Sequence, residues 1–162
     1  MGAPMNDTAQ TLADQIRLTV DYDQSLQQMI AARHYSWITP DIIAARIPMD
    51  GTGTVHVEAM LFHFDRFVSS EDAIKAINTE DPENPWEPAK IEHLLSFGVK
   101  HPDGQRTYPI LGLGSVAEVA EDRRVPCLDG TGTGCYLDLP WWDNVWSNNF
   151  RFLAVRNLSS GA

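Results

Sequence analysis

The chain has 162 residues, 43% hydrophobic and 21% charged, which is typical of one soluble globular domain. Its formal net charge of -10 disfavours general nucleic-acid binding and would attract a basic protein partner. No apolar run is long enough to span a membrane, so no membrane association is expected. The N-terminal residues lack a secretion signal and there are only two cysteines, so we expect a reducing, cytoplasmic location.

The first half of the chain alternates between strand and helix patterns. Residues 1–14 are polar and expected to form a disordered tail ahead of a single domain over 15–157. Alternation over 16–22 predicts a strand, and Asp23 is expected to cap a helix within 24–35. A further helical turn is expected to begin at Thr39-Pro40 and to end at Pro48.

The most regular stretch of the chain, residues 54–68, alternates as a strand whose two faces are both largely apolar, so it is predicted to lie centrally in its sheet. Ser69 is expected to cap the next helix, and the acidic, proline-rich residues 78–88 to form an exposed loop. A helix over 89–98 is predicted to end at Gly98 in a left-handed cap.

Residues from 108 onward are strand-like and joined by short connections, and residues 158–162 are expected to be a loose tail. The prediction is an α+β fold, a mainly antiparallel sheet with two or three helices packed on one face.

The pentapeptide Asp-Gly-Thr-Gly-Thr occurs twice, at 50–54 and 129–133. A phosphate loop needs a following helix, and a P-loop also needs a lysine, whereas both copies run into predicted strands. Both are therefore interpreted as turns at strand junctions. The second copy lies between Cys127 and Cys135, which would face each other in a hairpin centred on Thr131, leaving a disulfide and two reduced thiols as open alternatives.

Two histidine–acid pairs, His56/Glu58 and His63/Asp65, lie two residues apart on the predicted central strand. Each pair shares a face and could serve metal binding or acid–base chemistry, although a structural role is favoured. His63 and Asp65, with His93 as a distant third ligand, form the candidate metal set. For nucleophilic catalysis there is no nucleophile-elbow motif, and the glycines of residues 112–115 are interpreted as a bulge or close backbone packing.

Three of the five tryptophans fall within residues 141–146, interleaved with acids and amides. Tryptophan rings with amide groups are typical of surfaces that bind sugars or peptide edges, and tryptophan is enriched at protein interfaces. The alternative, which is favoured, is that these rings close one end of the core. The candidate binding residues are Trp37, Trp141, Trp142, Asp143, Asn144, Trp146, Asn148 and Asn149.

Three segments resemble landmarks of a family of small uncharacterised bacterial proteins. They are Tyr35/Trp37/Asp41, the run from Phe97-Gly98 and Pro102 to Gln105/Arg106/Pro109, and Arg151/Phe152/Val155/Arg156. The resemblance covers most of the chain after the N-terminal tail. It implies a bacterial or phage context and carries no known activity.

Three functions are consistent with these features. We favour a non-catalytic module that binds a protein, or less readily a glycan, through the tryptophan-rich corner, with self-association as a further expectation and without a cofactor. That hypothesis expects Trp142 or Trp146 to be partly exposed. The alternatives are a small metal-assisted hydrolase or lyase using His63 and Asp65, and an acidic nucleic-acid mimic that inhibits a nucleic-acid-binding protein.

Overall fold

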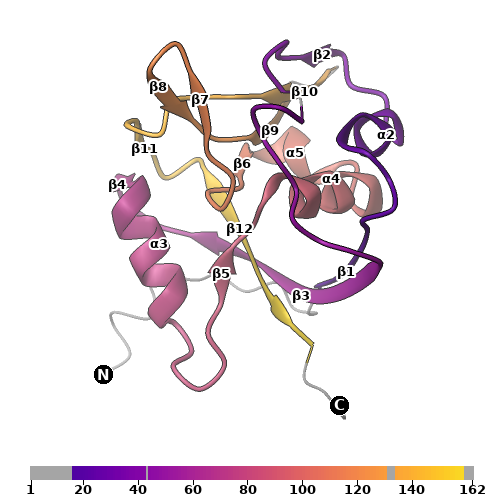
Figure 1. Cartoon of the computed structure of the whole chain (residues 1–162). Helices are drawn as coiled ribbons and strands as arrows, with labels where there is room; N and C mark the ends of the chain where they lie inside the picture. The colour runs from indigo at the N-terminus through magenta and orange to yellow at the C-terminus, as the bar shows by residue number, and fades with distance from the viewer. Residues whose placement is uncertain (1–15, 43, 131–133, 159–162) are drawn as a thin grey trace.

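The computed structural model describes residues 16–42, 44–130 and 134–158, and these form an α+β fold built on one large sheet (Figure 1). The helices described are α2 (Leu26–Ala31), α3 (Ser70–Thr79), α4 (Ile91–Lys100) and α5 (Gly104–Thr107). The first strands are β1 (Ile16–Asp21), β2 (Trp37–Ile38), β3 (Thr54–His63), β4 (Val68–Ser69), β5 (Glu87–Pro88) and β6 (Ile110–Leu111). The remaining strands are β7 (Ala117–Val119), β8 (Asp122–Arg124), β9 (Cys127–Gly130), β10 (Cys135–Asp138), β11 (Val145–Trp146) and β12 (Arg151–Asn157).

The main sheet has eight strands in the order β1-β3-β12-β6-β9-β10-β2, with β5 also paired to β12. Most pairs are antiparallel, as predicted, but β12 runs parallel to β6 and β10 runs parallel to β2. Two separate ribbons, β4–β11 and β7–β8, complete the strands described. None of the helices described is long and apolar enough to cross a bilayer.

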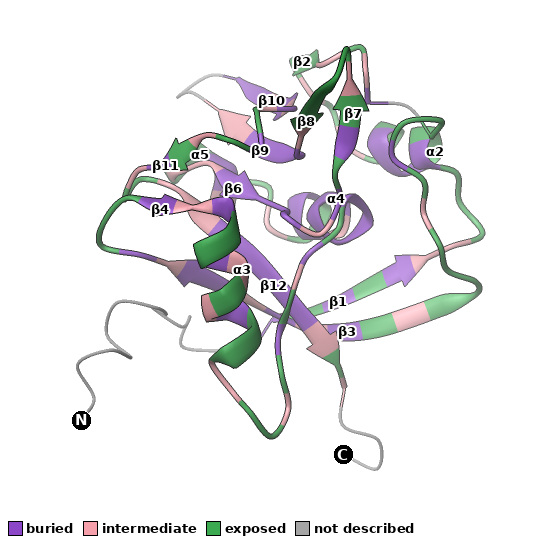
Figure 2. Ribbon diagram, turned by 60° about the vertical axis from the view of Figure 1, so that its left-hand side comes forward, coloured by how far each residue is buried: buried purple, intermediate pink, exposed green. Residues whose placement is uncertain are grey.

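Strand β3 lies between β1 and β12, which confirms that it is central. Because its side chains alternate, Val57, Ala59 and Leu61 enter the core beneath α2 and α4, whereas Phe62 and Phe64 enter a second core beneath α3. Helix α3 therefore lies on the face of the sheet opposite to α2 and α4 (Figure 1). Residues of β12 belong to both cores, and Figure 2 shows most of β12 as buried.

The first Asp-Gly-Thr-Gly-Thr segment is a connection into β3, as predicted. Gly53 has a φ of 67°, and its carbonyl accepts a hydrogen bond of 2.9 Å from the Tyr22 amide. A Cβ atom on Gly51 would lie 2.4 Å from the Tyr22 ring, so a side chain here would require that ring to move. In the second copy, Asp129 and Gly130 end β9, and residues 131–133 lie outside the residues described.

The two cysteines do not oppose each other. The β9–β10 register pairs Cys127 with Asp138 and Cys135 with Gly130, because the hairpin is not centred on Thr131. Both thiols are free and buried. Burial raises the pKa of the Cys127 thiol well above its ordinary value, which favours a neutral core side chain.

Several boundary predictions were wrong for local reasons. Ser25, rather than Asp23, caps α2, because its hydroxyl accepts from the Gln28 amide while the Gln28 side chain accepts from the Ser25 amide. Residues 39–42 and 44–48 contain turns in place of the expected helix. Gly98 does not end α4, since the helix continues to Lys100. Gly98 instead lies where a Cβ atom would be 3.1 Å from Arg33 and Tyr35.

Other predictions were confirmed. Ser69 caps α3 through a 3.1 Å bond from the Asp72 amide. Gly112 and Gly114 mark close packing, because a Cβ atom on Gly114 would lie 2.4 Å from the Pro88 carbonyl oxygen. Ser115 accepts a 2.8 Å bond from the first amide of α4, at Ile91, so it has a structural role. The predicted tails, 1–14 and 158–162, lie outside the described residues except for Leu158.

Candidate functional site

The tryptophan corner, residues 140–150, crosses from the β7–β8 ribbon to the β4–β11 ribbon. It is attached to the first by backbone bonds from Val125 to Pro140 and from Trp142 to Arg123, of 2.9 and 2.8 Å. A turn closed by the Asn144 amide and the Trp141 carbonyl, 3.2 Å apart, then leads into β11. Two backbone ribbons therefore fix the position of this segment.

Two of its tryptophans belong to the core. Trp146 is 1% exposed and Trp142 is 8% exposed. The buried Ser70 hydroxyl accepts a 2.9 Å bond from Trp146 Nε1 and donates a 2.7 Å bond to the Trp142 carbonyl, which attaches the corner to the first turn of α3. The expectation that Trp142 or Trp146 presents an exposed ring is wrong, because both rings pack into the core beneath α3.

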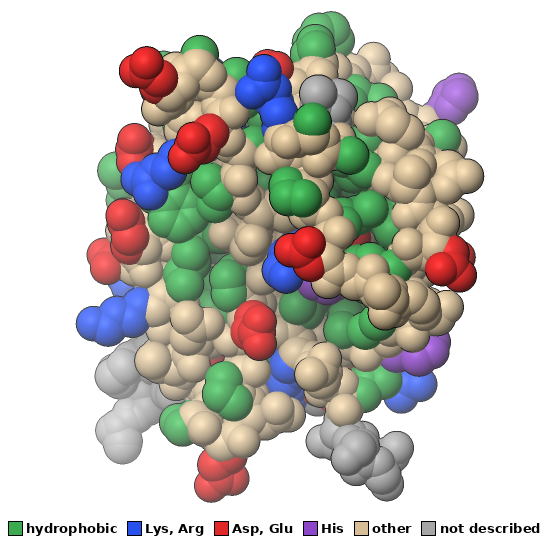
Figure 3. All heavy atoms as spheres, in the orientation of Figure 1, with side chains coloured by type: hydrophobic (Ala, Val, Ile, Leu, Met, Phe, Trp, Pro, Cys, Tyr) green, Lys and Arg blue, Asp and Glu red, His purple; other side chains and the backbone are tan. Residues whose placement is uncertain are grey.

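The corner exposes the large apolar side chains of Trp141 and Val145, and Phe67 is exposed just before β4, the strand that pairs with β11; these three residues are here called the outer patch. The exposed fractions of Phe67, Trp141 and Val145 are 68%, 52% and 62%, respectively. In the β4–β11 register Val68 and Trp146 form a pair that points inward, so alternation directs Val145 and Phe67 outward. In Figure 3 hydrophobic side chains lie beside basic and acidic ones in the part of the fold where Figure 1 shows β4, β8 and β11.

Arginines frame the outer patch. The Arg124 guanidinium lies 5.5 Å from the Trp141 ring centroid, and that of Arg123 lies 5.3 Å from the Trp142 centroid. Arg123 also forms an exposed ion pair of 3.3 Å with Asp143. Arg66 packs over Phe64, 5.7 Å from its centroid, next to exposed Asp65. The patch is therefore apolar at its centre and carries both charge signs around it, unlike the acidic chain as a whole.

The predicted amides lie at the margin of this region. Asn148 and Asn149 are exposed in the turn before β12. His63 Nε2 donates to the Asn148 carbonyl at 2.8 Å, and Arg151 Nη1 donates to the carbonyls of both Asn148 and Asn149 at 3.2 Å. These contacts use backbone carbonyls of the turn and give His63 a structural role.

Trp37 lies elsewhere. It belongs to β2, the terminal strand of the main sheet, whereas β4 and β11 form their own ribbon. In Figure 1 the label of β2 and those of β4 and β11 stand at opposite sides of the molecule. Trp37 is therefore not part of the outer patch.

The predicted metal set is not assembled. His63 pairs with Arg151 at one end of β3, whereas His93 lines a cavity with Val55 and Val57 near the other end. Within the described ranges, no group of three or more His, Cys, Asp or Glu side chains is placed to hold a metal ion. His93 Nδ1 accepts a 2.9 Å bond from the Lys90 amide and so caps α4.

A polar cluster that the sequence did not indicate lies at the start of α4. Glu92 is almost fully buried, and its Oε2 accepts a 2.7 Å bond from the Tyr22 hydroxyl. Burial is the main cause that raises the Tyr22 pKa, and the bond to Glu92 adds to it. Burial likewise lowers the pKa of His93. The adjacent cavity of about 170 Å³ is lined in part by Tyr22, Lys90, His93 and Arg156.

A second, partly buried network includes Pro102 and Gln105, two of the residues that carried the family resemblance. Arg33 donates to the side chain of Gln105, to the Pro102 carbonyl at 2.5 Å and to Cys135 Sγ at 3.0 Å. Gln105 donates in turn to the carbonyls of Asp129 and Tyr136, at 2.5 and 3.1 Å. These contacts cross-link the segment after α2, helix α5 and the β9–β10 hairpin, which gives Gln105 a structural role.

No family model, curated protein or solved structure matches this chain. The resemblance to small bacterial proteins therefore stays a prediction.

Proposed function

We propose that this protein is a non-catalytic module that binds another protein through the outer patch of Phe67, Trp141 and Val145. The observation that supports the proposal is the exposure of these three large apolar side chains, two on the tryptophan corner and Phe67 on the segment that leads into β4, the strand paired with β11. Exposed apolar groups that lie together are a feature of interaction surfaces. Trp146 and Trp142, which the sequence had suggested as contacts, would support the patch from beneath.

The surroundings of the patch suit a protein partner better than a glycan. A ring of tryptophan with arginines beside it is typical of the residues that dominate protein interfaces. Arg66, Arg123 and Arg124 also give this region three of the 12 basic residues of an otherwise acidic chain. The partner would present an apolar centre with carboxylates at its rim, rather than the basic surface expected from net charge.

The alternatives have less support. The metal-assisted mechanism required His63, Asp65 and His93 to converge, and they do not. A nucleic-acid mimic requires a row of free carboxylates, and in the acidic run 80–87 Asp81 is already paired with Arg156 at 2.9 Å.

The test is capture of a partner from the source cell on the immobilised 162-residue chain, followed by a binding titration with the purified partner. We expect Val145→Asp and Trp141→Ala to weaken the dissociation constant at least about tenfold. Trp37→Ala is the matched control, because Trp37 has a similar exposed fraction, 54%, on a different surface. Equal binding by the wild type and both patch variants would contradict the proposal.

A further inference from the structure

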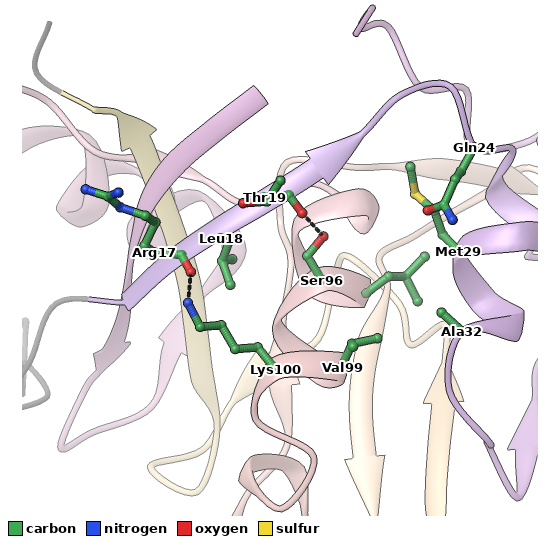
Figure 4. Close-up of a pocket in the computed structure, with 10 residues that line it drawn as sticks. Arg17, Leu18, Thr19, Gln24, Met29, Ala32, Ser96, Val99 and Lys100 are labelled. Carbon is green, nitrogen blue, oxygen red and sulfur yellow. Dashed lines mark hydrogen bonds between the residues drawn. The ribbon is translucent and has the colours of Figure 1, made fainter. Parts of the chain in front are cut away.

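Two hollows of the fold differ in whether the protein itself uses their polar groups. The groove beside β1, of about 290 Å³, is crossed by hydrogen bonds of the chain (Figure 4). Lys100 Nζ donates to the Arg17 carbonyl at 2.5 Å, and Ser96 Oγ donates to the Thr19 carbonyl at 3.1 Å. These two donors are therefore not free for a ligand. The cavity of about 170 Å³ at the start of α4, here called the α4 cavity, is different.

His93 gives the α4 cavity a hydrogen-bond donor that the fold does not use. Its ring lines the cavity and is only 8% exposed. Burial lowers the pKa of His93, and the neighbouring Glu92 carboxylate only partly offsets this, so the ring is neutral at pH 7. Because Nδ1 accepts from the Lys90 amide, the proton lies on Nε2, which forms no hydrogen bond with any described residue. An oxygen atom of a ligand would satisfy this N–H group.

The other walls of the α4 cavity restrict the size and shape of a ligand. Val55, Val57 and Val155 form an apolar wall. The Tyr22 hydroxyl donates its hydrogen to Glu92 Oε2 at 2.7 Å, so its oxygen can still accept a bond from a ligand. Cavities that hold drug-sized ligands measure about 300–1,000 Å³. The α4 cavity therefore suits a ligand of a few non-hydrogen atoms with an aliphatic part.

Charges on the wall indicate which polar groups the ligand carries. Arg156 is already paired with Glu58 and Asp81, at 2.7 and 2.9 Å. The Lys90 ammonium and the Glu87 carboxylate also line the cavity, and neither forms an ion pair with a described residue. One unpaired charge of each sign is matched by a ligand that carries both signs, whereas a ligand with a single charge would leave one of them unmatched.

We propose that the α4 cavity binds a small aliphatic amino acid in its zwitterionic form. The carboxylate of the ligand accepts from His93 Nε2 and lies near Lys90. Its ammonium group donates to the Tyr22 oxygen and is attracted by Glu87, and its side chain packs on the valine wall. None of the outer-patch residues lines this cavity, so the proposal does not depend on the proposed protein interface.

The test is a titration of the 162-residue chain with L-valine, followed by nitrogen NMR of histidine-labelled protein. We expect L-valine to shift the His93 Nε2 resonance saturably, with a dissociation constant of about 1 mM or lower. Isovalerate is valine without the ammonium group, and isobutylamine is valine without the carboxylate. Both should bind at least about tenfold more weakly, because each leaves one wall charge unmatched.

Exposed residues allow the two charges to be tested without disturbing the core. Glu87→Gln should raise the dissociation constant of valine at least about fivefold and leave that of isovalerate unchanged. Lys90→Gln should raise both constants. The matched controls are Glu118→Gln and Lys75→Gln, because these exposed residues do not line the cavity and should leave binding unchanged.

Three results would overturn the proposal. One is the absence of a saturable shift at His93 up to about 50 mM valine. Another is an affinity for isovalerate or isobutylamine equal to that for valine, which would show that the cavity does not recognise an amino acid. The third is an equal loss of binding in the cavity variants and in the controls.

Discussion

The Arg156 guanidinium stacks on the Trp86 ring, 4.0 Å from its centroid, while it bonds to Glu58 at 2.7 Å and to Asp81 at 2.9 Å. The acidic loop between α3 and β5 was predicted to be exposed. Part of it is instead held against β12 and β3 by this one side chain, and Trp86 is buried in the core.

Replacing Arg156 by alanine should lower the free energy of unfolding by about 2–4 kcal/mol, because Glu58 would remain largely buried without its cation. Urea denaturation measures the change. Arg106→Ala is the control, since Arg106 forms an exposed pair with Asp103 and should cost less than about 0.5 kcal/mol. Equal effects of the two substitutions would show that the Arg156 cluster contributes no more than a surface pair.

The same cluster predicts how stability changes at acid pH. The hydrogen bond from Arg156 lowers the pKa of Asp81, so the unfolded chain takes up a proton before the folded one does. Asp81 therefore makes its full contribution to the free energy of unfolding above the ordinary aspartate pKa of about 4. This contribution is lost as the pH falls through the lower pKa that Asp81 has in the folded protein. Asp81→Asn should destabilise at pH 7 and lose that effect toward pH 2. If the difference in free energy of unfolding between Asp81→Asn and the wild type stayed constant with pH, the role given to the Asp81 carboxylate would be contradicted.

The Ser70 hydroxyl gives a third prediction. Ser70→Ala would leave the buried Trp146 N–H without an acceptor and should cost about 1–3 kcal/mol. A double-mutant cycle with Trp146→Phe isolates the bond, and the two changes together should cost less than the sum of the single ones. Strict additivity would mean that the Ser70–Trp146 contact does not contribute to stability.

The β7–β8 hairpin contains local strain that can be removed. Its two loop residues, Ala120 and Glu121, have φ values of 51° and 72°, which favour asparagine and glycine. Ala120→Asn combined with Glu121→Gly should raise the free energy of unfolding by about 1 kcal/mol. Ala32→Asn, at a φ of -65°, is the control and should give no gain. Binding to the outer patch is a second readout, because this hairpin positions Arg123 and Arg124.

The strongly periodic parts of the fold could be predicted from sequence. β1, α3 and the central position of β3 follow from alternation, from a serine cap and from two apolar faces. Other features of the fold depend on contacts between residues that are far apart in the sequence, which local patterns do not reveal. Gly98 resembles a helix end locally but lies inside α4, where a Cβ atom would be 3.1 Å from side-chain atoms of Arg33 and Tyr35, and the parallel pairing of β12 with β6 has no local signal. The candidate site was only partly predictable. The composition of the tryptophan corner does not indicate that Trp142 and Trp146 are buried beneath α3 while Trp141 is exposed.

The position of β12 has a consequence for synthesis of the chain. Although β12 is the last strand along the described sequence, it lies between β3 and β6, which do not pair with each other. Until residue 157 has left the ribosome, β3 has an unpaired inner edge and the residues on both of its faces lack the packing partners that β12 supplies. We therefore expect the nascent chain to remain a substrate for chaperones and proteases until β12 has been synthesised, and to fold cooperatively only then.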